Sequence, residues 1–167
     1  MSSLPKNLFA SVLAGLLVAT VAHAQIKVGD RCPDLSAAGL EGTVPATAGQ
    51  VVWVDFWASW CAPCKASFPV YAKINDELRP RGLSLIAVSV DEKAADYTAF
   101  LKREKPPFAT VRDAGQKVVA AFRPPAMPTT YLIDRRGVVR FIHSGFHGAD
   151  TEKELRAELT ALLAEKP

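Results

Sequence analysis

Residues 51–64 read VVWVDFWASWCAPC, a strand pattern that leads directly into a C-x-x-C pair. Residues 51–57 are almost continuously apolar and rich in β-branched and aromatic side chains, which is typical of a central strand buried on both faces. From Cys61 onward, apolar residues recur at spacings of three and four, which predicts a helix. The stretch therefore predicts a strand, a short turn and a helix whose first turn carries both cysteines.

The rest of the sequence predicts a mixed sheet built around this unit. Further strands are expected at 83–90, 108–112, 129–133 and 138–143, and further helices at 91–105, at 116–122 and from Thr151. Thr151 and Glu154 have the spacing of a capping box for the last helix. This order predicts an α/β fold with a mixed central sheet and helices on both faces.

The first 24 residues have the composition of a cleavable signal peptide. A single positive charge at Lys6 precedes an apolar stretch, and Ala22-His23-Ala24 supplies the small residues of a cleavage site. The alternative is an uncleaved anchor, but the apolar stretch of about 15 residues is shorter than the roughly 20 that a spanning helix needs. We therefore expect a signal peptide at 1–24, a single domain at 25–167 and export to the periplasm.

The charge pattern argues against nucleic acid as a partner. The 20 Lys and Arg residues exceed the 17 Asp and Glu residues by only three, and these charges are spread along the chain. No basic run with interleaved aromatic residues is present, so a nucleic-acid surface is not expected.

The C-x-x-C pair favours redox chemistry. A bond between Cys61 and Cys64 closes too small a ring to stabilise the fold by stapling it. A helix N-terminus favours a thiolate, so Cys61 is expected to be an exposed thiol of lowered pKa and Cys64 a shielded resolving thiol. The alternative, half of a zinc site, needs two further ligands, which Cys32 alone does not provide. We expect no metal and no cofactor other than the redox-active disulfide itself.

Asp55 is the one charged residue in the apolar 51–57 run. Burial there would raise the pKa of its carboxyl, and such a group can accept a proton near neutral pH. The alternative is an Asp that reaches water at a sheet edge. Met127-Pro128 lies just before the predicted hairpin, where a cis peptide bond would turn the backbone of Met127 toward the dithiol and a bound substrate segment.

Three segments carry a family resemblance: VDFWASWCAPCKASFP at 54–69, LSLIAVSVD at 83–91 and MPTTYLIDRRGVVRFIHSG at 127–145. With VGDRCPDL at 28–35, they resemble the thioredoxin superfamily, and within it the exported TlpA-like and ResA-like reductants. The resemblance extends over residues 26–165. It implies a three-layer thioredoxin-like fold with a TlpA-like insertion between the second buried strand and the Met127-Pro128 block.

The resemblance also assigns roles to single residues. Cys61 corresponds to the attacking thiol, Cys64 to the resolving thiol and Asp55 to the buried acid of thioredoxin. Pro128 corresponds to the cis-proline and Trp60 to the tryptophan beside the active site. The residues expected to contact substrate are Trp60, Ala62, Pro63, Met127 and Pro128.

Two positions depart from the subfamilies. TlpA-like proteins often have Asn where this chain has Asp55, and ResA-like proteins carry an acidic residue where it has Ser67. Cytochrome c maturation and general disulfide reduction therefore stay open as alternative roles.

The expected function is that of a periplasmic thiol–disulfide oxidoreductase that reduces disulfides in exported proteins. The dipeptide Ala62-Pro63 contains no His to stabilise the thiolate, which favours a reductant over an oxidant. The resemblance implies a membrane thiol transporter as the electron donor.

Two other classes of protein stay open. A peroxiredoxin-like peroxidase would need a Pro-x-x-x-Thr/Ser-x-x-Cys segment, and a copper-delivery protein of the Sco type would need C-x-x-x-C with a partner His; the sequence contains neither pattern.

Three residues outside the predicted site have side chains that can react or bind metal. Cys32 is expected to be an inert buried thiol, with a regulatory or intermolecular disulfide as the alternative. His143 and His147 match no metal-ligand spacing, so we expect them to face solvent.

Overall fold

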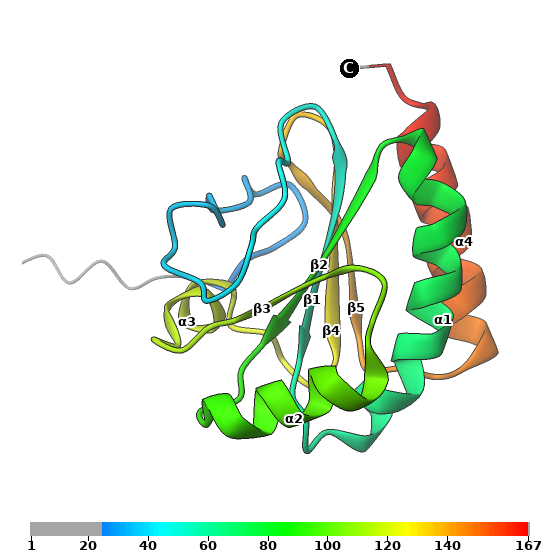
Figure 1. The fold of residues 1–167 in the computed structure, drawn as a ribbon. Helices are drawn as coiled ribbons and strands as arrows, with labels where there is room; N and C mark the ends of the chain where they lie inside the picture. The colour runs from blue at the N-terminus through cyan, green and yellow to red at the C-terminus, as the bar shows by residue number, and fades with distance from the viewer. Residues whose placement is uncertain (1–24, 167) are drawn as a thin grey trace, which may run out of the picture.

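The computed structural model describes residues 25–166, so the predicted signal peptide at 1–24 lies outside the described part of the chain. A five-stranded sheet in the order β3-β2-β1-β4-β5 forms the middle of the molecule (Figure 1). Strands β1 and β3 are parallel to β2, whereas β4 is antiparallel to both β1 and β5. The predicted mixed sheet is confirmed, with strands β1 Val51–Trp57, β2 Leu83–Ser89, β3 Ala109–Arg112, β4 Thr129–Ile133 and β5 Val139–Ser144.

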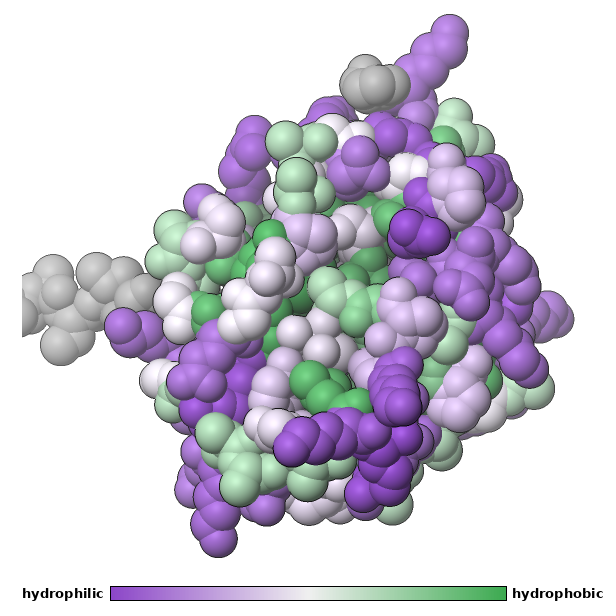
Figure 2. All heavy atoms as spheres, viewed as in Figure 1, coloured by the Kyte–Doolittle hydropathy of each residue, from purple (hydrophilic) through white to green (hydrophobic). Residues whose placement is uncertain are grey.

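Helices lie on both faces of this sheet, as predicted. Helices α1 and α4 run side by side along one face, and α3 lies on the other face with the segment that precedes β1 (Figure 1). Hydrophilic residues crowd the outer side of the α1–α4 layer, at the right of Figure 2, which fits helices with one face toward solvent. The helices are α1 Ala62–Leu78, α2 Ala94–Glu104, α3 Lys117–Phe122 and α4 Ala149–Ala164, with a 3-10 turn at Arg79–Arg81.

The central strand β1 divides its side chains between two cores. Trp53 and Trp57 pack into the core beneath α1 and α4, whereas Val54 and Phe56 pack into the core on the α3 side. Successive side chains of a strand point to opposite faces, so Asp55 lies on the same face as Trp53 and Trp57. The sheet therefore directs this carboxyl toward the layer that carries the dithiol.

Two predicted helix starts are wrong. The last helix begins at Ala149 after Gly148, and the Thr151 hydroxyl accepts a hydrogen bond from the His147 N–H at 2.9 Å, so Thr151 and Glu154 form no capping box. The helix expected at 91–105 begins only at Ala94. Asp91 does not enter this helix, because its carboxylate binds the loop that precedes the dithiol.

No helix within residues 25–166 is both long enough and apolar enough to cross a membrane.

Candidate active site

The two cysteines of the C-x-x-C pair form a disulfide at the start of α1, with their Cα atoms 5.3 Å apart. Cys61 is the N-cap residue, and its Sγ accepts a hydrogen bond from the backbone N–H of Cys64 at 3.3 Å. Pro63 is tolerated in this first turn because N–H groups there have no partner within the helix. No acidic residue lies in the first turn, so nothing there opposes negative charge on the Cys61 sulfur.

Three apolar residues next to the disulfide in the sequence are exposed. Trp60 is 68% exposed, and Ala62 and Pro63 are exposed beside it. Cys61 itself is only 5% exposed in the disulfide form, so the prediction of an exposed thiol is wrong, because Cys61 packs into the core beneath α1. Cys64 is fully buried, as expected of the shielded member of the pair.

The predicted cis bond is present between Met127 and Pro128. Pro128 is buried, and Met127 is half-buried against both hydrophobic cores. The cis-proline therefore immediately precedes β4, the strand that pairs with the central strand β1.

Asp55 is completely buried, which excludes an Asp that reaches water at a sheet edge. It lies opposite Thr130 of β4, whose hydroxyl donates a hydrogen bond to Asp55 Oδ1 at 2.7 Å. Oδ2 is also buried and has no hydrogen-bond partner. Desolvation raises the pKa of Asp55 to about 7, although the hydrogen bond from Thr130 and the nearby Tyr71 hydroxyl partly oppose the rise. The carboxyl can therefore change its protonation state near neutral pH.

A buried polar network connects Asp55 with α1. The Tyr71 hydroxyl lies 3.5 Å from Thr130 Oγ1, and the Trp53 indole N–H donates to the same oxygen at 3.3 Å. On the next turn of α1 toward the dithiol, the Ser67 hydroxyl donates to the Cys64 carbonyl at 2.8 Å. Thr130 was not among the residues predicted for the site. The signal in the sequence is a polar residue at position 130, directly before Tyr131 in a strand that is otherwise largely apolar.

A second buried carboxylate holds the loop before the dithiol. Asp91 is 2% exposed and accepts hydrogen bonds from both the hydroxyl and the backbone N–H of Ser59, at 2.9 and 3.1 Å. The Ser89 hydroxyl adds a third donor at 2.8 Å. Ser59 stands two residues before Cys61, so Asp91 fixes the approach of the chain to the redox pair.

We expect Asp91→Ala to lower the free energy of unfolding by about 2–4 kcal/mol, because several hydrogen bonds to a buried charged group are lost together. Ser59→Ala removes a single side-chain donor and should cost only about 1 kcal/mol. Urea unfolding of both variants in the oxidised state measures these losses. Equal effects of the two substitutions would show that Asp91 does not hold this loop.

The remaining candidate residues lie outside this site. Cys32 is partly buried, and desolvation raises the pKa of its thiol to about 12, as expected of an inert thiol. His143 does not face solvent as predicted: its Nε2 lies 2.5 Å from Glu158 of α4, because β5 and α4 pack together there. Across residues 25–166, no three His, Cys, Asp or Glu side chains are placed to hold a metal ion.

The fold and the disulfide at the start of α1 define a thioredoxin-like protein, and the chain is a thiol–disulfide oxidoreductase of the ResA/DsbE type. Residues 28–142, well over half of the chain, match the AhpC/TSA family, to which the chain belongs.

Named relatives and solved structures agree with this assignment. Thiol-disulfide oxidoreductase ResA of Geobacillus thermodenitrificans is 29% identical over 140 residues, covering 82% of this chain and 79% of the relative. The Geobacillus kaustophilus ResA is 30% identical over 123 residues, covering 72% of this chain and 71% of the relative. A Chlorobium tepidum crystal structure, described as a candidate thiol:disulfide interchange protein DsbE, is 33% identical with a TM-score of 0.77, covering 84% of this chain and all of that one.

Proposed function

We propose that this protein is a periplasmic reductant of disulfides in exported proteins, and that Cys61 and Cys64 carry the reaction. The observation that carries the proposal is the placement of the pair. Cys61 caps α1 and accepts the Cys64 N–H, an arrangement that stabilises a thiolate once the disulfide is reduced. The exposed Trp60, Ala62 and Pro63 and the half-buried Met127 next to Pro128 supply an apolar surface for the substrate segment.

The cycle begins from the reduced pair. The Cys61 thiolate attacks one sulfur of the substrate disulfide, which forms a mixed disulfide and releases the other substrate sulfur as a thiolate. Cys64 then loses its proton to Asp55 and attacks the Cys61 sulfur, which releases the second substrate thiolate. The substrate gains two electrons, and the protein is left with the Cys61–Cys64 disulfide that the structure contains.

The protein must then be reduced again by a dithiol. We infer that a membrane thiol transporter supplies these two electrons, because export would separate the protein from cytoplasmic thiols. The proposal of export rests on the composition of residues 1–24.

Direct measurement of the reduction potential tests the reductant role. Ala62-Pro63 lacks a His that would stabilise the Cys61 thiolate further, so we expect a potential nearer to about −270 mV, as in thioredoxin, than to about −120 mV, as in the oxidant DsbA. Equilibration of the Cys61–Cys64 pair against glutathione buffers gives the value. A potential above about −170 mV would place the protein among the oxidants instead.

Cys32, the one cysteine outside the redox pair, could reduce peroxide only as a thiolate. The raised pKa of Cys32 keeps this thiol protonated at neutral pH, which makes it a poor nucleophile for peroxide. This observation argues against a peroxidase that uses Cys32 and leaves the Cys61–Cys64 pair as the reactive group.

A further inference from the structure

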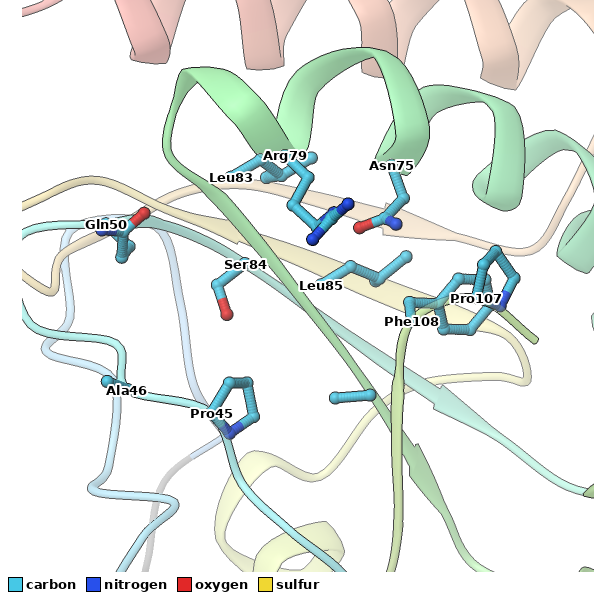
Figure 3. Close-up of a pocket in the computed structure, with 11 residues that line it drawn as sticks. Pro45, Ala46, Gln50, Asn75, Arg79, Leu83, Ser84, Leu85, Pro107 and Phe108 are labelled. Carbon is cyan, nitrogen blue, oxygen red and sulfur yellow. The ribbon is translucent and has the colours of Figure 1, made fainter. Parts of the chain in front are cut away.

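A cavity of about 290 Å³ lies at the end of the sheet away from the dithiol. Strand β3 pairs with β2 only from Ile86 onward, so the first residues of β2, Leu83 to Leu85, have no strand beside them on that edge. The cavity occupies this place, between the last turn of α1, the segment at Pro107–Phe108 and the loop at Pro45 (Figure 3). Dithiol and cavity stand at opposite ends of α1, which separates Cys64 from Arg79 by about 20 Å along the helix axis.

Two donors point into this cavity, one from the last turns of α1 and one from the 3-10 turn that follows it. Asn75 is 2% exposed, and its buried Nδ2 has no hydrogen-bond partner. A buried amide without a partner costs about 1–3 kcal/mol of stability, so its presence needs a reason other than folding. Arg79 is an exposed residue at the start of the 3-10 turn, and its side chain extends to the same space (Figure 3). Within residues 25–166, the Arg79 guanidinium forms no ion pair.

Apolar side chains form the part of the cavity wall that faces these donors, whereas Gln50 and Ser84 are polar residues elsewhere in the lining. Leu85 and Phe108 are buried and face the two donors, and Pro107 borders them (Figure 3). A positive charge and an unpaired N–H beside a hydrocarbon surface complement a carboxylate joined to a short apolar group. The cavity volume lies just below the range of about 300–1,000 Å³ for typical ligand sites, so the cavity fits only a small ligand.

We propose that this cavity binds a carboxylate that bears a branched aliphatic group, with the carboxylate held by Arg79 and the Asn75 amide and the aliphatic group against Leu85 and Phe108. Such a ligand has two sources, a free short-chain acid or the carboxyl-terminal residue of a peptide. Both present the same chemistry to the cavity.

Titration of the oxidised protein, followed by NMR of the side-chain and backbone amides, tests the proposal. We expect 4-methylpentanoate or N-acetyl-glycyl-leucine to shift the Asn75 side-chain amide and the Leu85 amide in a saturable way. The neutral 4-methylpentanamide should bind at least ~10-fold more weakly, because it has no negative charge and cannot form a bidentate ion pair with the Arg79 guanidinium. Tighter binding of N-acetyl-glycyl-leucine would identify the carboxyl terminus of a peptide as the natural ligand. Tighter binding of 4-methylpentanoate would identify a free short-chain acid instead.

A matched pair of variants locates the site. Arg79→Gln should weaken binding at least ~10-fold, whereas Arg81→Gln, which changes an exposed arginine of the same 3-10 turn outside the cavity, should leave it unchanged. Disulfide reduction by both variants should equal that of the unsubstituted protein. Equal binding of acid and amide, equal effects of the two substitutions, or no saturable shift with either carboxylate would overturn the proposal.

Discussion

Cys61→Ser should reduce insulin disulfides at least ~1,000-fold more slowly than the unsubstituted protein, because the variant has no thiolate at the start of α1 to attack the substrate. Cys64, fully buried behind Cys61, cannot replace it. The turbidity of insulin reduced in the presence of dithiothreitol measures this rate.

Cys32→Ala is the matched control, since it removes the third cysteine and leaves the pair intact. Its rate should equal that of the unsubstituted protein. A large loss of activity in Cys32→Ala, or retained activity in Cys61→Ser, would contradict the assignment of roles.

Asp55→Asn should slow the resolution of the mixed disulfide by Cys64 by about 10- to 1,000-fold near neutral pH, the range expected when a general base is lost. Asn keeps the size of the side chain and can still accept the Thr130 hydroxyl. The first attack by Cys61 should change much less, because the helix terminus stabilises that thiolate. Stopped-flow measurements of both steps between pH 5 and pH 9 separate the two effects. If resolution shows the same rate and pH profile in both proteins, Asp55 takes no part in proton transfer.

The same substitution should change stability in a pH-dependent way. Because burial raises the pKa of Asp55 from 3.8 to about 7, the native protein binds more protons than the unfolded chain between these values. Stability contributed by the protonated carboxyl is therefore complete below pH 4 and is lost as the pH rises through 7. At 1.36 kcal/mol for each pH unit between the two values, the loss amounts to at most about 4 kcal/mol. Asp55→Asn should remove this loss, so its gain in unfolding free energy should be larger at pH 8 than at pH 4. Urea unfolding of both proteins at the two pH values measures the difference.

The sequence predicts this fold well where a local pattern and the tertiary environment agree. Residues 51–57 have few ways to be buried other than as a central strand, and a carboxyl within them must be desolvated, so the environment of Asp55 follows from its neighbours. The C-x-x-C pair lies between a strand pattern and a helical pattern, so its location at the start of a helix also follows from the sequence.

Contacts between distant segments account for what the sequence did not reveal. The sequence pattern places Asp91 at the start of a helix. Only its contact with Ser59 in the structure shows that it binds the loop before Cys61. Tyr71 fits the apolar stripe of α1, and its hydroxyl becomes informative only when β4 brings Thr130 next to it. The cavity at Asn75 depends on where β3 ends, which no periodicity in the sequence specifies.

The most direct test of dithiol exchange is to identify the cysteine that becomes linked to a substrate. Reduced Cys64→Ser protein, mixed with a disulfide-containing peptide at pH 7 and quenched with acid, should accumulate a covalent complex. Peptide mapping by mass spectrometry should find the peptide linked to Cys61 and Cys32 unmodified. A complex linked through Cys32, or no complex in this variant while Cys61→Ser forms one through Cys64, would contradict the proposed mechanism.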